Sequence, residues 1–310
     1  MIQMAFRKCA RFTAGVFALA VAITAGSAAP LTYVIANNDA EGTHHFGIVD
    51  LATGAFQQIG PDAPVGTEGL ASGPTGSLFT LAYNSDLYSI NPTTGAYTLV
   101  GPTGLDDCST PASPCGPTSN LTLGGANGNL YATDFQNRLY LVDPLTGLAT
   151  LIGATGIPPI PFIPASFNPN GTINLYEEAL FGFGGELYAT FDAFSFDFTT
   201  LSPDTVAVGP ALYRINTATG VATLIAPTDL AIGAVSAIGG TAYGFNLLQG
   251  NVFTLDVANG TTTSVTATDL AAGTIRGAAA VPEPASFGIT AAGLVLALAA
   301  RRRYFPAART

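Results

Sequence analysis

Short segments in which apolar and polar residues alternate recur along the chain from about residue 30 to about residue 280. Five of them, FGIVD, LYSIN, LYLVD, LYRIN and VFTLD, end in Asp or Asn and lead into a turn and a second alternating segment. Period-two alternation over about four to eight residues is typical of half-buried antiparallel β-strands. The pattern therefore predicts a series of strand–turn–strand units.

The turns share one sequence: Asp or Asn, then three residues, then Gly. They begin at Asp50, Asn91, Asp143, Asn216 and Asp256. The first side chain can accept hydrogen bonds from the backbone N–H groups that follow, and the glycine can take the positive φ that closes a short hairpin. Each turn is therefore predicted to join two antiparallel strands.

Two further patterns precede most of these units. One is a strand of the type GSLFTLAY, GNLYATDF, GELYATFD or GTAYGFNL, and before it lies a strand of small residues, as in EGLASGP, SNLTLGG, EALFGFG and GAVSAIG. Four short strands repeated at intervals of about forty residues are typical of the blades of a β-propeller. The small residues suit an innermost strand, which must fit the crowded axis.

The two ends of the repeat region complement each other. The unit that starts at LTYVIANN has only three strands, and AAGTIRGAAAV, Ala271–Val281, supplies a fourth after the last unit. Pairing the two would close the ring and remove its open edge. We therefore predict an all-β fold, a propeller of about five four-stranded blades; the long interval between Asp143 and Asn216 keeps six blades as the alternative.

Two segments depart from the repeat. IPPIPFIPASFNPN, Ile157–Asn170, carries five prolines and is predicted to be an irregular loop between blades. Phe191–Pro210 is an insertion within the fourth blade. Its aromatic residues Phe191, Phe194, Phe196 and Phe198 either belong to an extra hairpin packed on the blade or form an exposed apolar patch for protein–protein adhesion.

Residues 1–29 have the three parts of a secretory signal peptide. Arg7, Lys8 and Arg11 are followed by an apolar stretch and by the small residues Gly26–Ala29. The body, residues 30–281, is then exported. It contains all of the 20 acidic residues except Glu283, against no lysine and the three arginines Arg138, Arg214 and Arg276. Because nucleic acids and anionic lipids are bound through Lys and Arg, this composition excludes both as partners of the body.

Two cysteines remain in the body, Cys108 and Cys115, in the sequence DDCSTPASPCG. Cysteines in an exported protein are typically oxidised, so this pair predicts a disulfide that closes a tight loop. By the loop-entropy relation such a bond stabilises the fold by roughly 2–3 kcal/mol. The alternative, a redox or metal pair, lacks both C-x-x-C spacing and a nearby histidine.

The body carries no linear catalytic motif: G-x-S-x-G, H-E-x-x-H, a P-loop and a nucleotide-binding G-x-G-x-x-G are all missing from the sequence. We therefore expect no catalytic residue and no cofactor. The alternative is a propeller enzyme or metal-dependent hydrolase or lyase with carboxylates in the axial channel, for which Asp86, Asp134 and Asp192 occupy similar places in three blades. Their competing role is to cap the hairpins between second and third strands.

Metal binding has two weak candidates. His44 and His45, with Asp39 and Glu41, could form a mixed site, but adjacent residues of a strand point to opposite faces, so a solvated hairpin loop is the favoured interpretation. The acidic residues Asp106, Asp107, Glu177, Glu178, Asp192 and Asp197 could hold Ca²⁺. No EF-hand loop accompanies them.

The C-terminal residues 282–310 contain, in order, Pro282-Glu283-Pro284, an apolar run that ends at Ala300, and the cluster Arg301, Arg302 and Arg303. With these three parts the tail resembles the PEP-CTERM sorting signals of Gram-negative bacteria. Ala285–Ala300 would span about 24 Å as a helix, less than the roughly 30 Å of a bilayer core, and the arginines would keep the tail end cytoplasmic. A transmembrane helix here is therefore expected to anchor the chain only transiently.

This resemblance implies an exosortase-like membrane transpeptidase as a partner and an association with exopolysaccharide and biofilm. It implies a final location at the cell surface or in the extracellular matrix of a Gram-negative bacterium. Together with the missing catalytic motifs, it predicts a non-catalytic structural or binding module.

Overall fold

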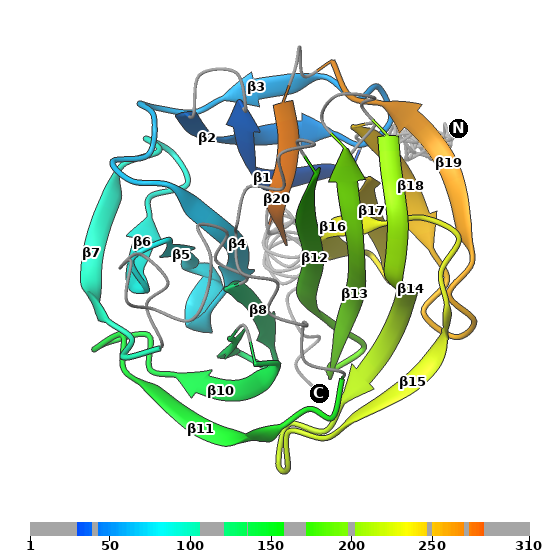
Figure 1. Ribbon diagram of the computed structural model, residues 1–310. Coiled ribbons are helices and arrows are strands. Elements are labelled where there is room, and N and C mark those ends of the chain that lie inside the picture. Colours follow the sequence, from blue (N-terminus) through cyan, green and yellow to red (C-terminus); the bar gives the residue numbers. More distant parts are fainter. Residues whose placement is uncertain are drawn as a thin grey trace, which may run out of the picture.

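The computed structural model describes residues 30–38, 43–105, 121–134, 136–157, 172–197, 202–246, 250–269 and 273–281. These residues form five antiparallel four-stranded sheets arranged as blades around one axis (Figure 1). The strands β4, β8, β12, β16 and β20 lie innermost, and β3, β7, β11, β15 and β19 form the rim. The predicted all-β propeller is confirmed, with five blades and not six.

The first and second blades contain the following strands, from the axis outward: β20 (Gly273–Ala280), β1 (Leu31–Asn38), β2 (Thr43–Asp50) and β3 (Phe56–Gln58); β4 (Thr67–Ser72), β5 (Leu78–Ala82), β6 (Asp86–Ile90) and β7 (Tyr97–Pro102). The third, fourth and fifth blades contain β8 (Thr122–Ala126), β9 (Asn129–Thr133), β10 (Arg138–Val142) and β11 (Ala149–Ala154); β12 (Thr172–Phe183), β13 (Glu186–Asp197), β14 (Ser202–Ile215) and β15 (Ala222–Pro227); β16 (Ile232–Ile238), β17 (Thr241–Asn246), β18 (Asn251–Leu255) and β19 (Thr262–Ala267). A short 3₁₀ turn, Pro74–Gly76, joins β4 to β5.

The ring closes through a blade shared by the two ends of the repeat region, as predicted. Strand β20 pairs with β1 in antiparallel register from Thr32↔Ala280 to Asn38↔Gly273. The buried Thr32 hydroxyl donates a hydrogen bond of 2.9 Å to the Ala279 carbonyl oxygen. Closure therefore depends on contacts between residues about 240 positions apart.

The Asp/Asn turns have the predicted geometry. In all five, the first side chain accepts a hydrogen bond of 2.9 Å from the backbone N–H two residues later, and the glycine has a φ between 68° and 84°. Each turn also contacts the preceding blade. A Cβ on the turn glycine would lie 1.9–2.8 Å from a carbonyl oxygen on the outer strand of that blade, or just after it. The repeated glycine thus serves both the hairpin and the contact between blades.

The inner strands approach one another as closely as their small residues allow. A Cβ on Gly124 would lie 2.4 Å from the Leu180 carbonyl oxygen, and one on Gly277 would lie 2.5 Å from the Leu70 backbone nitrogen. The buried apolar side chains form clusters between neighbouring blades, with Phe46, Phe191, Phe245 and Phe253 the largest fully buried ones. Crowding at the axis therefore explains the small-residue strands.

The fourth blade is built differently from its prediction. Its insertion does not add a separate hairpin but lengthens β13 and β14. Strands β12 and β13 each have 12 residues, and β14 has 14. Phe191 is buried in the core, while Phe194 and Phe196 lie on β13 opposite Leu175 and Ile173 of β12. These longer strands take up much of the interval that allowed a sixth blade.

Several predictions fall outside the described residues: the signal peptide 1–29, the disulfide Cys108–Cys115, most of the proline-rich segment, Phe198, and the tail with Pro282, Glu283, Pro284, Arg301, Arg302 and Arg303. In the part of the chain that the structure does describe, no helix has the length and apolar character needed to span a membrane.

Candidate functional site

Five residues, three of them charged, occupy equivalent positions of the five inner strands beside the axial cavity. We call these residues the mouth ring: Glu68 (β4), Thr122 (β8), Glu178 (β12), Gly233 (β16) and Arg276 (β20). Each directly precedes a small or aliphatic residue that lines the axial cavity. Contacts between neighbouring inner strands show that these positions are equivalent: Gly277 lies against Gly69, and Gly69 lies against Leu123.

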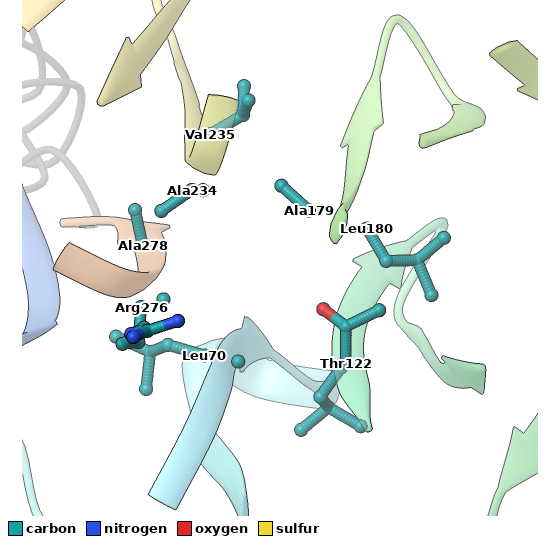
Figure 2. Close-up of a pocket in the computed structure, with 12 residues that line it drawn as sticks. Leu70, Thr122, Ala179, Leu180, Ala234, Val235, Arg276 and Ala278 are labelled. Atoms are coloured by element: carbon teal, nitrogen blue, oxygen red, sulfur yellow. The ribbon is translucent and has the colours of Figure 1, made fainter. Parts of the chain in front are cut away.

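The cavity below the mouth ring is very small. Its volume is about 10 Å³, and its walls include Leu70, Ala179, Ala234 and Ala278, with Arg276 at its edge (Figure 2). A buried cavity of about 10–15 Å³ has room for a single water molecule. The axis therefore has no room for a whole substrate molecule at this level, and any larger ligand would lie outside, on the mouth.

Two buried polar atoms on β20 have no hydrogen-bond partner among the described residues: Nε of Arg276 and the hydroxyl of Thr274. Glu178 interacts with the nearby Thr133 hydroxyl, and neither this hydroxyl nor Oε1 of Glu178 has another partner among these residues. Burying a polar group without a partner is costly. An external ligand or an ordered water would satisfy these groups.

Burial also shifts the two mouth carboxyl groups toward the neutral form. It raises the pKa of Glu68 to about 7, although the Arg276 charge and the Tyr83 hydroxyl favour ionisation. It raises the pKa of Glu178 to about 8, with the Thr133 hydroxyl acting in the opposite direction and the Asp134 charge adding to the rise. Near neutral pH, both groups can therefore carry a proton.

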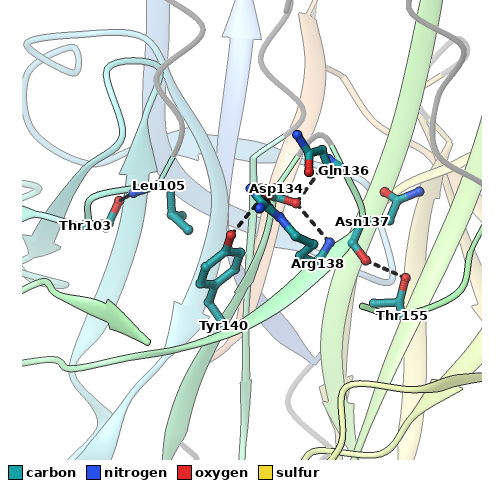
Figure 3. A network of polar contacts seen from close by, with 8 residues as sticks. All are labelled: Thr103, Leu105, Asp134, Gln136, Asn137, Arg138, Tyr140 and Thr155. Carbon is teal, nitrogen blue, oxygen red and sulfur yellow. Dashed lines mark hydrogen bonds and ion pairs between the residues drawn. The ribbon is translucent and has the colours of Figure 1, made fainter. Parts of the chain in front are cut away.

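Asp134, whose charge acts on Glu178, has a structural role in its own blade, and Figure 3 shows its contacts. It is fully buried, and its Oδ1 accepts backbone hydrogen bonds from Gln136 and Arg138, at 3.1 and 2.9 Å. Its Oδ2 accepts bonds from the Arg138 guanidinium, at 2.7 Å from Nε, and from the Tyr140 hydroxyl at 3.1 Å. The carboxylate thus fixes the turn between β9 and β10, as the capping interpretation predicted.

The three aspartates proposed for an axial catalytic group do not gather. Asp86 starts β6 and accepts a bond from the Asn84 amide, whereas Asp192 is buried in the middle of β13 opposite Glu177. No group of three or more His, Cys, Asp or Glu side chains suited to a metal occurs within the described ranges. The capping prediction is therefore wrong for Asp192, because the lengthened strands move the hairpin end away from it.

The two histidines lie on strand β2 and not in a solvated loop. His44 is buried, and its Nδ1 is 2.9 Å from the Thr67 carbonyl oxygen. His45 is half-buried, and its Nδ1 is 2.8 Å from Oδ1 of Asp62. They point to opposite sides of the strand, as predicted, and each has a protein partner; Asp39 and Glu41 are outside the described residues.

Sequence reasoning missed the mouth ring and a second repeated element. After the outer strand, Thr103 and Thr155 donate hydrogen bonds of 2.6 Å to the carbonyl oxygens of Ser85 and Asn137. Each hydroxyl also accepts a bond from the backbone two residues later, at Leu105 or Ile157, which is buried. Figure 3 shows the contact between Thr103 and Leu105 and the one between Thr155 and Asn137. The repeated T-G-L and T-G-I triplets were the available signal for this element.

Comparisons with known proteins give no family for the chain. No family model matches it, and no curated protein is similar in sequence. Among solved structures, a chain from a nidogen/laminin complex is 10% identical over 82% of this chain and 99% of its own length, with a TM-score of 0.46. The PQQ-bound aldose sugar dehydrogenase of Streptomyces coelicolor is 13% identical over 67% of this chain and 62% of its own length, with a TM-score of 0.37.

Proposed function

We propose that the protein is an exported, non-catalytic propeller that works as a binding or structural module at the cell surface or in the extracellular matrix. The observation that carries this proposal is the axis itself. At the level that the described inner strands enclose, a cavity of about 10 Å³ leaves no room for a whole substrate molecule, while Arg276 beside it has an unpartnered Nε. Such a surface suits recognition of an external group.

The location rests on the two ends of the sequence. The N-terminal segment 1–29 has the features of a signal peptide, and the tail has the PEP motif, apolar run and arginine cluster of a sorting signal. An exosortase-like transpeptidase is the proposed processing partner, and exopolysaccharide is a proposed matrix partner. The body without lysine, and with the arginines Arg138 and Arg214 paired to acids, suits neither nucleic acid nor an anionic membrane.

The proposed location and processing can be tested by fractionation of the producing bacterium and by mass spectrometry of the mature C-terminus. We expect wild-type protein in the surface or matrix fraction, ending near Pro284. The double substitution Glu283→Gln and Pro284→Ala should retain the chain in the inner membrane, and Pro306→Ala, at the end of the tail, should behave as wild type. Equal processing of all three proteins would contradict the sorting proposal.

One observation favours a second candidate function. Glu68 and Glu178 each directly precede a residue that lines the axial cavity, and both have raised pKa values, which is a property of acid–base groups in enzymes. Turnover of polysaccharides or esters by wild type, abolished by both Glu68→Gln and Glu178→Gln, would establish an enzyme. Binding without turnover would support the non-catalytic module.

A further inference from the structure

We infer that Thr43 is a nucleophile that accepts an acyl group from an activated ester, with His45 as the base that takes its proton and Asp62 as a positioning residue. The three side chains form a continuous hydroxyl–imidazole–carboxylate chain in the first blade. The inference goes beyond the proposed binding role, because it adds a covalent reaction at a place away from the axis. Neither proposal depends on the other.

The chain runs through both nitrogen atoms of one imidazole ring. The Thr43 hydroxyl oxygen lies 3.1 Å from Nε2 of His45, and Nδ1 of the same ring lies 2.8 Å from Oδ1 of Asp62. A hydroxyl within about 2.6–3.2 Å of a base that a third group orients is the arrangement that activates hydroxyl nucleophiles in proteins. The contacts in the first blade have this order and these distances.

The hydrogen bonds of Asp62 decide which ring nitrogen carries the proton. Oδ1 of Asp62 also accepts a hydrogen bond of 3.0 Å from the side-chain amide of Gln58. An ionised carboxylate can only accept, so the neutral ring of His45 places its proton on Nδ1 and leaves the lone pair of Nε2 free. Nε2 therefore accepts the Thr43 hydroxyl, which is the direction that a general base requires.

The local fold holds these groups together. Thr43 and His45 are two residues apart on β2, so their side chains lie on one face of the strand. The segment that follows β3 runs back along β2. There the N–H of Ala63, the residue directly after Asp62, donates a hydrogen bond of 2.8 Å to the carbonyl oxygen of His44. This backbone bond keeps the carboxylate beside the imidazole.

A reagent in solution can reach the site. The side chain of His45 is 19% exposed and that of Asp62 is 52% exposed, and Thr43 is partly exposed at the start of β2. Strand β2 is the third strand of its blade from the axis. The narrow axial cavity therefore does not limit the size of the acyl donor.

The propeller repeat does not require this chain of contacts. Both histidines of the sequence lie on β2, and the pairing of third and fourth strands gives the positions equivalent to His45 in the other blades. These positions hold Asp86, Arg138, Ala211 and Asn251. The fold is built without an imidazole there, so the first blade has a feature that folding alone does not explain.

The reaction is acyl transfer. Nε2 of His45 takes the hydroxyl proton of Thr43 while the hydroxyl oxygen bonds to the carbonyl carbon of the ester. The bond from that carbon to the leaving oxygen then breaks, and the leaving group takes up the proton from His45. The products are O-acyl Thr43 and a free alcohol or phenol, so no further reactant is needed. A chain that is acylated once and keeps its acyl group remains the non-catalytic module proposed above.

The test is incubation of the full-length protein in detergent at pH 8 with p-nitrophenyl acetate, followed by peptide mass spectrometry. We expect a burst of about one equivalent of p-nitrophenol per protein molecule, with the acetyl group on Thr43. The body has no lysine, so no side-chain amine between residues 30 and 281 competes. The ether p-nitroanisole, which has no acyl group, is the matched probe and should not react.

Thr43→Val should abolish the burst, whereas Thr43→Ser, which keeps a hydroxyl, should retain it. His45→Gln should slow acylation at least about a hundredfold, the usual contribution of a general base. Thr150→Val, which removes an exposed threonine on the outer strand β11, is the matched control and should react as wild type.

Asp62 acts through His45, so its test includes a rescue. Asp62→Asn should slow acylation, because the amide can donate to Nδ1 and so place the ring proton on Nε2. Asp62→Glu, which restores a carboxylate, should recover part of the rate. If His45→Gln does not fold, this pair of variants supplies the comparison.

The inference is overturned if wild type is not acylated, if the acetyl group lies on another residue such as His45, or if Thr43→Val and Thr150→Val react equally. Equal rates for Asp62→Asn and wild type would remove the positioning role of Asp62. Each of these outcomes leaves the proposed surface module in place, because fractionation of the bacterium tests that module separately.

Discussion

Gly95 lies directly against the carbonyl oxygen of Ile59: a Cβ atom on Gly95 would be 1.9 Å from that oxygen. Gly95 closes the turn between β6 and β7 of the second blade, whereas Ile59 follows β3 of the first. The equivalent glycines Gly54, Gly147, Gly220 and Gly260 make the same contact around the ring. One sequence position therefore shapes each hairpin and joins neighbouring blades.

Replacing Gly95 by alanine should destabilise the protein by about 2–4 kcal/mol, because the positive φ and the contact with Ile59 both oppose a Cβ. Gly104 is the matched control, since its φ of 71° is similar but nothing lies within 4 Å of its Cβ position. Gly104→Ala should cost only about 1 kcal/mol. Urea unfolding of both variants measures the difference; equal losses would show that contact between blades contributes nothing.

The closing strand β20 should be essential to stability, because it covers the inner edge of β1. Ile275 on β20 is 1% exposed and packs among Val34, Val49 and Phe245. Ile275→Ala should therefore lower the free energy of unfolding by about 2–5 kcal/mol. Leu31→Ala, on the neighbouring strand and 40% exposed, should change it far less. A loss for Ile275→Ala no greater than that control would argue against a closed ring.

Removing Arg138, the ion-pair partner of Asp134, should lower the free energy of unfolding, because the Asp134 carboxylate is fully buried. Arg138→Met is expected to destabilise the protein by about 2–4 kcal/mol by leaving this charge uncompensated. Arg214→Met, which breaks an exposed pair with Glu186, should cost less than about 1 kcal/mol. The double variant Arg138→Met/Asp134→Asn should recover part of the loss in thermal unfolding. A double variant no more stable than Arg138→Met alone would count against the ion pair.

The raised pKa of Glu178 predicts a stability that falls as the pH rises. The folded state holds its proton up to about pH 8, and the unfolded state releases it near 4.5. Between these values the folded state binds more protons, so stability declines with rising pH and levels off above about 8. Glu178→Gln removes the titrating group and should flatten this decline. Between pH 5 and pH 9, the free energy of unfolding of the variant should therefore rise by at least about 1 kcal/mol relative to that of wild type.

Unfolding curves of wild type and Glu178→Gln at pH 5, 7 and 9 measure this effect. Glu186→Gln serves as the control, because that carboxyl group is exposed and its replacement should leave the pH dependence of wild type unchanged. Parallel pH profiles for wild type and Glu178→Gln would show that Glu178 ionises at its ordinary pKa.

Much of the fold could be predicted because its determinants are local and repeated. Period-two alternation, the Asp/Asn–Gly turn and a small-residue strand recur in each unit, and the complementary ends imply ring closure. The fourth blade was harder, because the same aromatic and β-branched residues can form a new hairpin or lengthen existing strands. Only the pairing of β12, β13 and β14 decides between these.

The candidate site was not predictable in the same way. Glu68, Glu178 and Arg276 follow one another at intervals of about 100 residues and share no motif, so nothing local marks them as parts of one ring. Asp134 and Asp192 looked equivalent in sequence, yet one caps a turn and the other lies within a strand. Site residues that come from different blades meet only when the ring closes.

By itself, the sequence determined the strands, the turns, the repeat and a closed ring of five or six blades, because hydrophobic periodicity and turn chemistry act over a few residues. The tertiary structure alone decided which side chains meet at the axis, how little space remains between the inner strands, and which carboxyl groups lose contact with water. These properties depend on packing among strands that are distant in sequence, because only that packing brings charged residues of different blades beside the apolar axis.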